Sequence, residues 1–236
     1  MTVASFEACA RSIDATGLSA RGAFHVEADD EVPRGPRGGA ARTVILVGNT
    51  GSTFWSVFRR SPEFRDGLAH PLDRWSERVI TGLARELGGH AVFPFKGPPF
   101  YPFQQWARRA EALSPSPLGM LIHPEYGLWH AYRGALVVDG HLAGLPDRAE
   151  AESPCLACAA QPCLTTCPVE AFSTAGFDAD TCTTHLSGPN ACVDGGCRAR
   201  NACPAGKPFQ YVREQHRFHL SAFFRARGGE TGGGAR

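Results

Sequence analysis

The spacing of apolar residues divides the first part of the chain into short strands and amphipathic helices. Thr43 to Val47 is a short β-branched apolar run that predicts a buried strand, and His90 to Phe95 predicts another. Apolar side chains recur at helical spacing from about Leu72 to Leu87, and a further helix is predicted from Pro102 to Leu113. This alternation of strands and helices indicates an α/β domain. The residues expected on one face of the first of these helices are Val79, Leu83 and Leu87.

The second part of the chain has a different pattern. Met120 to Val138 predicts two or three strands interrupted at Pro124 and Gly134, and Leu142 to Pro154 is polar and irregular, as in a linker. Phe209 to Arg227 predicts a closing helix. These boundaries divide the chain into an α/β domain (1–145), a cysteine-rich module (154–206), and a closing helix with a flexible Gly-rich tail (207–236).

Composition narrows the class of protein. The 236 residues are 43% hydrophobic, which is enough for a buried core, and the net charge of +1 gives no electrostatic attraction to nucleic acid or to a membrane surface. No apolar run reaches the roughly 18 residues of a membrane span, and the N-terminus lacks the features of a signal peptide. We therefore expect a soluble, cytoplasmic protein with no nucleic-acid or membrane partner.

Cysteine is concentrated in one stretch, because eight of the nine cysteines lie between Cys155 and Cys203. The stretch follows the pattern C-x2-C-x4-C-x3-C-P, then Cys182, then C-x4-C-x5-C-P. Two [4Fe–4S] clusters need eight thiolates, and in two-cluster ferredoxins the cysteine before proline ligates the other cluster. This rule, applied twice, predicts two ligand sets: Cys155, Cys158, Cys163 and Cys203 for one cluster, and Cys167, Cys182, Cys192 and Cys197 for the second.

Two other interpretations of the cysteines compete with iron–sulfur ligation. Structural zinc sites also use paired cysteines, but they give no reason for a proline after the last ligand. A disulfide framework needs an oxidising compartment. The Gln161-Pro162 insertion lengthens one ferredoxin spacing from x2 to x4. The sequence therefore specifies the presence of two clusters better than it specifies which cysteines bind each cluster.

A segment from His123 to Gly134 combines aromatic side chains, two histidines and an arginine around glycines. Aromatic faces with a few polar groups are typical of a pocket for a large planar cofactor. The same composition also fits a half-buried sheet with Trp129 in the core. Shortly afterwards, Asp139 to Gly144 matches D-x-H-x-x-G, which we interpret as a common Asp-Gly turn and not as a cobalt-binding loop.

The His123–Gly134 segment is similar to the H-P-x-[FY]-G-G-W-F-A-x-R-G stretch of CblC-type vitamin B12 processing proteins. It also resembles the corresponding G-S-W-F segment of epoxyqueuosine reductases, in which a two-cluster ferredoxin module follows. The resemblance covers about residues 43–206. It implies a nitroreductase-like α+β scaffold joined to a ferredoxin-like module, with cobalamin bound at the scaffold. The residues that it implies in cofactor binding are His123, Gly127, Trp129, Arg133 and Gly134.

The chain also departs from both families. The Asp-[TS]-[GA]-Pro and Gly-Lys-Asn segments of epoxyqueuosine reductases are absent, so no catalytic residue is assigned, and CblC-type proteins of animals lack the cysteine module. The resemblance implies an oxidoreductase in which two [4Fe–4S] clusters receive electrons from a redox partner and reduce cobalamin or another small-molecule substrate. The alternatives are a ferredoxin-like electron carrier that docks a partner protein, an epoxyqueuosine-reductase-like enzyme, and a flavin in the same pocket.

Overall fold

The computed structural model describes residues 5–147, 151–173 and 176–229. The chain divides into two compact units and passes between them three times. Unit 1 spans residues 1–112 and 130–150, and unit 2 spans residues 113–129 and 151–236. The sequence placed a boundary at 145–154, close to the last crossing, but gave no sign that residues 113–129 lie with the cysteine-rich part.

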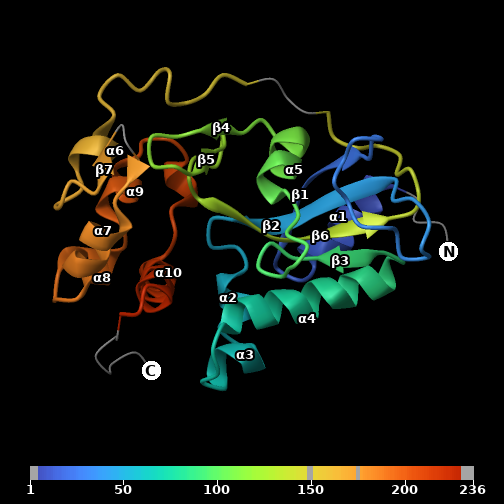
Figure 1. Cartoon of the computed structure of the whole chain (residues 1–236), viewed down its shortest axis with the longest axis horizontal. Helices are drawn as coiled ribbons and strands as arrows, with labels where there is room; N and C mark the ends of the chain where they lie inside the picture. Colours follow the sequence, from blue (N-terminus) through green and yellow to red (C-terminus); the bar gives the residue numbers. More distant parts are fainter. Residues whose placement is uncertain (1–4, 148–150, 174–175, 230–236) are drawn as a thin grey trace. The chain divides into compact units, whose positions relative to one another are not determined.

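Unit 1 is built on one antiparallel sheet in the order β1-β2-β6-β3 (Figure 1). Its strands are β1 (Ser19–His25), β2 (Thr43–Thr50), β6 (His130–Val138) and β3 (His90–Val92). In β2, Val44, Ile45, Leu46 and Val47 are each 0% exposed. The continuous apolar run predicted a buried strand, and this prediction is confirmed.

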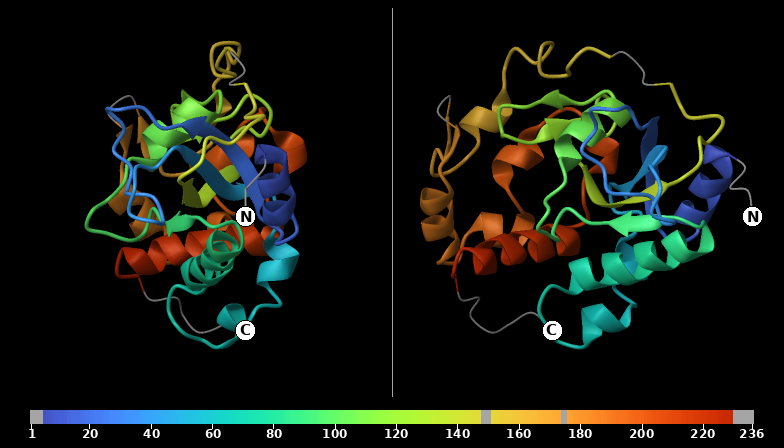
Figure 2. Two further views of the ribbon diagram at one scale, coloured as in Figure 1. Left: turned by 90° about the vertical axis from the view of Figure 1, so that its right-hand side faces the viewer. Right: turned by 45° about the vertical axis from the view of Figure 1, so that its right-hand side comes forward.

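Five helices belong to unit 1: α1 (Phe6–Asp14), α2 (Trp55–Phe58), α3 (Pro62–Arg65), α4 (Pro71–Glu86) and α5 (Phe103–Ala110), counted over the described residues. Helix α4 runs along β6 and β3, while α1 and α5 contact β1 (Figure 2). Proline at the start of α4 fits the helix because the first N–H groups have no partner there. Helices therefore cover the apolar sheet, as a mixed α/β unit requires.

The buried face of α4 differs from the predicted face. Trp75, Ile80, Leu83 and Ala84 are buried, whereas Val79 and Leu87 are only partly buried. Of the predicted face, Leu83 alone is fully enclosed. Trp75, which the choice of aliphatic residues alone had left out, packs against Phe54 and Phe58 at α2.

Strand β6 is not interrupted at Gly134, contrary to the prediction. It pairs with β2 along its length, with a register shift between Val47 and Gly48 of β2 opposite Gly134 and Tyr132. A Cβ atom at Gly134 would lie 2.9 Å from both the Val92 carbonyl oxygen and Ile80 Cδ1. Glycine thus marks close packing against β3 and α4 at an irregularity of the sheet, where the sequence suggested a break.

Unit 2 consists of short elements. Two-stranded ladders pair β4 (Ser114–Pro115) with β5 (Leu121–Ile122), and β7 (Phe172–Ser173) with β8 (Gly176–Phe177). The helices are α6 (Pro162–Thr165), α7 (Ala179–Leu186), α8 (Ala191–Gly195), α9 (Arg198–Ala202), the 3-10 turn η1 (Lys207–Phe209) and α10 (Arg213–Ala226). The closing helix therefore begins later than predicted, because η1 ends at Phe209 and α10 begins only at Arg213.

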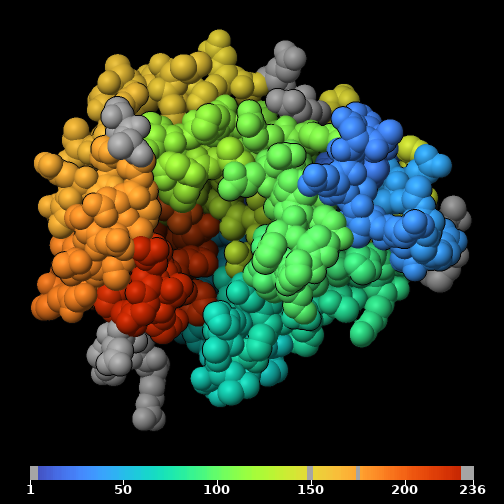
Figure 3. Space-filling model, in the orientation of Figure 1, coloured from blue at the N-terminus to red at the C-terminus, as the bar shows by residue number. Residues whose placement is uncertain are grey.

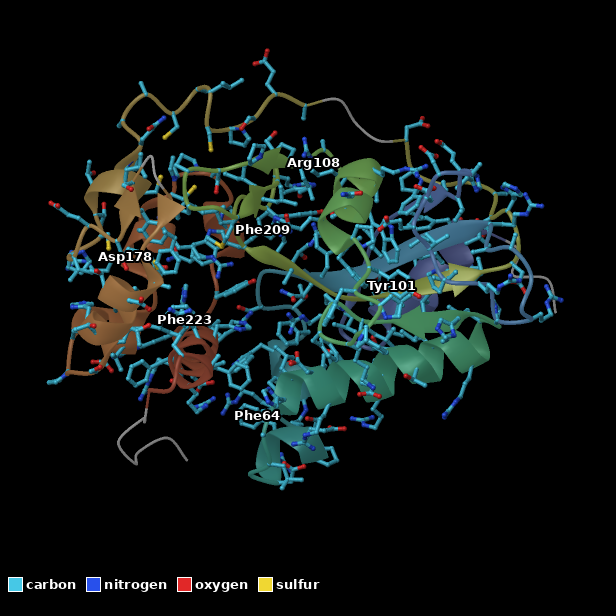
Figure 4. All side chains as sticks on the ribbon, viewed as in Figure 1. Phe64, Tyr101, Arg108, Asp178, Phe209 and Phe223 are labelled. Carbon is cyan, nitrogen blue, oxygen red and sulfur yellow. The ribbon has the colours of Figure 1, made fainter. Side chains whose placement is uncertain are left out.

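Side-chain caps mark the start of two helices of unit 2, α7 and α8. The Asp178 carboxylate, labelled in Figure 4, accepts hydrogen bonds from the backbone N–H groups of Asp180 and Thr181 at the start of α7. The Asn190 side chain accepts from Cys192 and Val193 N–H at the start of α8 in the same way. These caps satisfy N–H groups that such short helices leave without intrahelical partners, and they fix where α7 and α8 present their cysteines.

The apolar core of unit 2 includes cysteines. Leu118, Ile122 and Leu128 cluster with Cys163, Ala199 and Cys203, and a second cluster joins Leu186, Cys192 and Phe224. Figure 3 shows α7 and α8 (orange) against α10 (red), whose Leu220 and Phe223 pack on that second cluster. Thiols therefore lie where a domain of this size ordinarily places aliphatic side chains. No helix within the described residues is long and apolar enough to cross a membrane.

Candidate functional site

The first predicted cysteine set lines one small cavity in unit 2. Cys155 and Cys158 come from the loop before α6, Cys163 from α6, and Cys203 from the end of α9. Ile122 and Ala205 complete part of the apolar wall. The structure thus brings together four thiols separated by up to 48 positions in the sequence, including the one before Pro204.

The electrostatics of this cavity show that its thiols interact. Burial, and next the nearby Cys203, Cys155 and Cys158, raise the pKa of the Cys163 thiol. Burial also raises the pKa of Cys203, with Cys155 and Cys158 adding to it. Several thiolates in one apolar cavity repel one another, so the deprotonated set needs a positively charged partner.

The second predicted set also gathers within unit 2, and its Cys167 and Cys197 pack against the same apolar cluster as Cys163 and Cys203. Cys167 follows α6, Cys182 lies on α7, Cys192 lies on α8, and Cys197 precedes α9. Burial raises the pKa of Cys182 to about 11, with further contributions from Cys197, Cys167 and Cys192. The side chains of this set therefore face one another as those of the first set do, and sulfur atoms are visible among these elements in Figure 4.

Backbone N–H groups point at the sulfur atoms of both sets. Ala171 N–H donates to Cys167 Sγ at 3.4 Å. Backbone hydrogen bonds from Arg200 and Ala199 lower the pKa of Cys197, although burial raises it overall, and Ala205 N–H acts on Cys203 in the same way. Such donors favour the thiolate and, in iron–sulfur proteins, help to set the reduction potential.

Among the described residues, no group of three or more His, Cys, Asp or Glu side chains is arranged to hold a single metal ion. Structural zinc would require four ligands at about 2.0–2.3 Å from one point. A four-iron cube, by contrast, is held at separate corners, which keeps the cysteine sulfur atoms further apart. Four thiols around one cavity, with N–H donors to sulfur, are the donor set that fits a [4Fe–4S] cluster.

The segment His123 to Trp129 lies in unit 2, beside the first cysteine set. His123 Nδ1 accepts hydrogen bonds from the N–H groups of Glu125 and Tyr126, at 3.1 and 3.2 Å. Since Nδ1 is an acceptor, the ring proton of the neutral imidazole is on Nε2. The imidazole also stacks on Tyr126, with ring centroids 4.3 Å apart. His123 is thus held in place by its own turn, with its ring proton on Nε2.

Gly127 connects this segment to the chain that follows Cys203. Its φ is +57°, and a Cβ atom there would lie 2.2 Å from the Ala205 carbonyl oxygen. Backbone hydrogen bonds in both directions join Gly127 to His123 at 2.9 Å. The positive φ and the close backbone contact both require glycine here. The sequence predicted Gly127 in cofactor binding, and the structure gives it this packing role.

Trp129 is 0% exposed and is enclosed within unit 2. Its ring lies 4.6 Å from the Arg200 guanidinium, 5.2 Å from the His216 ring and 5.3 Å from the Tyr211 ring. Burial and the Arg200 cation together lower the pKa of His216 to about 4. Sequence reasoning missed Arg200, Tyr211 and His216. The one available signal was an arginine between two predicted ligands, Cys197 and Cys203.

The other two predicted cofactor residues lie in unit 1, on β6. The guanidinium of Arg133 is 3.7 Å from the carboxylate of Asp73 on α4, and Gly134 packs against β3. The five predicted residues are therefore divided between the two units. Within unit 1, an open groove of about 520 Å³ is lined by side chains that include Arg60, Trp75 and Arg78. None of the five residues lines that groove.

The D-x-H-x-x-G motif forms a turn after β6, as the sequence interpretation held. Asp139 pairs with Arg37 at 2.9 Å, and His141 Nδ1 lies 3.2 Å from His25 Nδ1. Thr43 Oγ1 donates to the Gly140 carbonyl oxygen at 2.8 Å. These contacts tie the turn to the ends of β1 and β2.

Among solved structures, the fold of this chain is similar to that of a B12-trafficking protein. The B12-trafficking protein CblC of C. elegans, a homologue of human MMACHC, matches with a TM-score of 0.53 and 14% identity, over 92% of this chain and 95% of that one. Epoxyqueuosine reductase from Bacillus subtilis matches with a TM-score of 0.45 and 17% identity, over 72% of this chain and 50% of that one.

The corresponding enzyme from Streptococcus thermophilus gives a TM-score of 0.41 and 14% identity, over 73% of this chain and 51% of its own. This chain thus spans about half the length of those reductases. No family model matches the sequence, and no curated protein matches it. The similarity to CblC extends over nearly all of both chains and defines the fold of this one.

Proposed function

We propose that this protein is an iron–sulfur reductase that binds and reduces cobalamin, using two [4Fe–4S] clusters held by unit 2. The observation that carries the proposal is the gathering of eight cysteines into two sets of four, on a chain with the fold of a B12-trafficking protein. Iron–sulfur clusters reach reduction potentials of about −700 mV, low enough to supply electrons to cobalt.

In this proposal the residues of unit 2 bind and orient the clusters. Cys155, Cys158, Cys163 and Cys203 hold the first, and the set that contains Cys182 holds the second. The N–H groups of Ala171 and Ala205 stabilise negative charge on sulfur. The apolar side chains of Ile122 and Leu128 limit water near the first set. The protein therefore supplies position and dielectric, and the metal centres supply the redox chemistry.

We further propose that His123 contributes to cobalamin binding as a hydrogen-bond donor and not as a cobalt ligand. Its Nδ1 lone pair already accepts two backbone N–H groups, which leaves the proton on Nε2. Ligation through Nε2 would require loss of that proton, or a tautomer that gives up both hydrogen bonds. Arg133 stays a residue of unit 1 that the sequence resemblance implies in cofactor binding, and a flavin is the alternative occupant.

A second candidate function is a ferredoxin-like electron carrier that docks a partner protein and binds no cobalamin of its own. The observation that favours it is Leu156, which is 79% exposed between Cys155 and Cys158. An apolar side chain on the surface beside a cluster suits contact with a redox partner. Such a partner also serves the main proposal, as the electron donor. Cobalamin binding therefore separates the two functions.

The clusters are tested by anaerobic reconstitution of the full chain. Two clusters require about eight iron and about eight sulfide per protein. Cys203→Ser should remove the first cluster and leave about four iron. Cys9→Ala is the matched control, because Cys9 is a buried thiol of unit 1 outside both sets. Stoichiometric zinc without iron absorbance would refute the clusters, and loss of only the second cluster in Cys203→Ser would refute the grouping.

Cobalamin is tested by titration with cob(II)alamin followed by electron paramagnetic resonance. We expect binding with the vitamin's own base displaced and no nitrogen hyperfine splitting from an axial imidazole. His123→Ala should weaken binding and leave the signal type unchanged. An axial nitrogen that disappears in His141→Ala would show that the D-x-H-x-x-G turn ligates cobalt. Binding of flavin without cobalamin would overturn the cobalamin proposal and leave the clusters intact.

A further inference from the structure

The Arg200 side chain has an unusual environment within unit 2. Arg200 lies on α9, between Cys197 and Cys203 in the sequence. Its guanidinium is 4.6 Å from the ring centroids of both Trp129 and Tyr211. It also donates a hydrogen bond to the Leu128 carbonyl oxygen. The cation is therefore held between two aromatic faces, which attract it through their negative quadrupoles and restrict its motion.

This cation has no counter-charge among the described residues. No carboxylate pairs with Arg200, and its buried Nε atom has no hydrogen-bond partner there. Arg21 of unit 1 shows the contrast, because its buried guanidinium is paired with Glu111 at 2.9 Å. Arg200 is partly buried and its Nε atom is enclosed, and a cation that has lost part of its water gains from negative charge nearby.

The second cysteine set includes Cys197, which lies close to Arg200 in the sequence. The backbone N–H of Arg200 donates to the Cys197 sulfur, so the residue that carries the cation also touches a predicted ligand. His216, next to Trp129, packs on Gly196, the residue before Cys197. The Arg200 side chain and the second set therefore belong to one continuous group of contacts in unit 2.

We propose that Arg200 is the counter-charge of the second [4Fe–4S] cluster and raises its reduction potential; the inference rests on the proposed function. Reduction adds one electron to the cluster and therefore one negative charge to its thiolate-bound core. A fixed cation beside it stabilises the reduced form more than the oxidised form. The rings of Trp129 and Tyr211 exclude water and so limit the screening of this attraction. Arg200 acts as a positioning residue for electron flow and forms no bond to iron.

The test is a dithionite redox titration of the reconstituted full chain, followed by electron paramagnetic resonance. The Cys203→Ser background, in which the second cluster is expected to remain, assigns the signal. For Arg200→Gln, the ratio of reduced to oxidised second cluster at a fixed potential should fall about tenfold, equivalent to about 59 mV for a one-electron couple. Arg200→Lys keeps the charge and should recover most of that ratio. Arg198→Gln removes an exposed charge from the same helix and should change the ratio about twofold or less, because water screens it.

If Arg200→Gln does not form the clusters, Arg200→Met serves as the second variant. The methionine side chain fills the same site between the aromatic rings without a charge. An unchanged ratio in the neutral variants would overturn the inference, as would an equal fall in Arg200→Lys. If the clusters form and the ratio of reduced to oxidised second cluster does not change in the neutral variants, only the role of Arg200 is refuted and the proposed function stands. A wild-type chain that forms no iron–sulfur cluster would refute the proposed function and this inference together.

Discussion

Unit 1 and unit 2 are stabilised by different means. In unit 1, β2 and its neighbours bury aliphatic side chains completely, and Trp75 and Trp106 are each 1% exposed. Unit 2 instead places Cys163, Cys192 and Cys203 inside its two small apolar clusters. Several of its helices have only four or five residues, and of these α8 begins at a side-chain cap, that of Asn190. Hydrophobic burial accounts for unit 1, whereas the described residues of unit 2 form two small apolar clusters that include cysteines.

The difference shows that one chain can combine a self-sufficient core with a part whose order depends on its ligands. Buried thiols contribute modest apolar area, and their raised pKa values disfavour the thiolates while no cation is present. Metal–thiolate bonds remove that cost and cross-link short elements that cannot fold alone. The predictions below test this contrast, beginning with the largest expected effect.

Removal of iron should unfold unit 2 and leave unit 1 folded. Thiolate–metal bonds contribute on the order of 10 kcal/mol in small metal-bound domains, more than the two small apolar clusters can replace. Hydrogen exchange of the full chain, before and after anaerobic chelation, should show lost protection in α7, α8 and α9 and unchanged protection in β2 and β6. The control is the same chelator saturated with metal. If unit 2 keeps its protection after iron loss, its stability does not depend on metal–thiolate bonds and the proposed difference between the two units is wrong.

Glu111→Gln should destabilise unit 1 without affecting iron content. Arg21 is 1% exposed and donates two hydrogen bonds to the Glu111 carboxylate, so the variant leaves a buried cation without its partner. Loss of one partner of a buried pair costs about 3–5 kcal/mol. Denaturant unfolding followed by a unit 1 signal measures the change.

The matched control is Glu7→Gln. Its exposed pair with Arg11 should contribute less than about 1 kcal/mol. Equal effects of the two substitutions would show that burial of the Arg21–Glu111 pair does not matter for unit 1.

The two glycines that the sequence assigned to cofactor binding should differ in cost when replaced. Gly127→Ala forces a residue with φ of +57° against the Ala205 carbonyl, so we expect unit 2 to lose about 2 kcal/mol or more without any ligand. Gly134→Ala should cost unit 1 about 1 kcal/mol, because its backbone contact is longer at 2.9 Å. Gly188→Ala, which meets nothing within 4 Å, is the control. If Gly127→Ala leaves the stability of unit 2 unchanged but abolishes cobalamin binding, Gly127 would again be assigned to cofactor binding.

The smallest effect should be a pH dependence carried by His216 of unit 2. Its pKa is lowered to about 4 in the folded state, from about 6.5 when unfolded, so the folded state keeps the imidazole neutral. The associated stability is complete above about pH 6.5 and is lost as the pH falls toward 4, by up to about 1 kcal/mol per pH unit. Unfolding of the iron-loaded chain at about pH 7 and about pH 5.5 measures it. His216→Phe should remove this part of the slope, and an unchanged slope would contradict the assignment.

Much of unit 1 was predictable because each element repeats one local pattern. The strand from Thr43 and the helices ending near Leu87 and Leu113 follow directly from apolar spacing. The continuation of β6 through Gly134 was not predictable, because only the neighbouring Val92 and Ile80 show why a side chain is excluded there. Local sequence indicates a break at glycine, and tertiary packing decides otherwise.

For the candidate site, the spacing and the Cys-Pro pairs predicted which cysteines the structure brings together, because a proline-marked ligand pattern carries long-range information. The environment of Trp129 was not predictable. Arg200, Tyr211 and His216 are remote from it in sequence, and no local pattern couples an arginine to aromatic residues that far away. The sequence alternative that placed Trp129 in a core agrees with its complete burial.

The excursion of residues 113–129 into unit 2 has a consequence for protein engineering. A fragment cut at residue 150 contains every predicted cluster ligand but lacks Leu118, Ile122 and Leu128, which pack against Cys163 and Cys203. The cavity lined by its first ligand set would lose part of its apolar wall, and Arg200 would lose its contacts with Trp129 and the Leu128 carbonyl. The cysteine-rich part therefore cannot be moved to another protein by itself. A chimaera that donates it to another scaffold needs the earlier loop grafted in as well, at two further splice points.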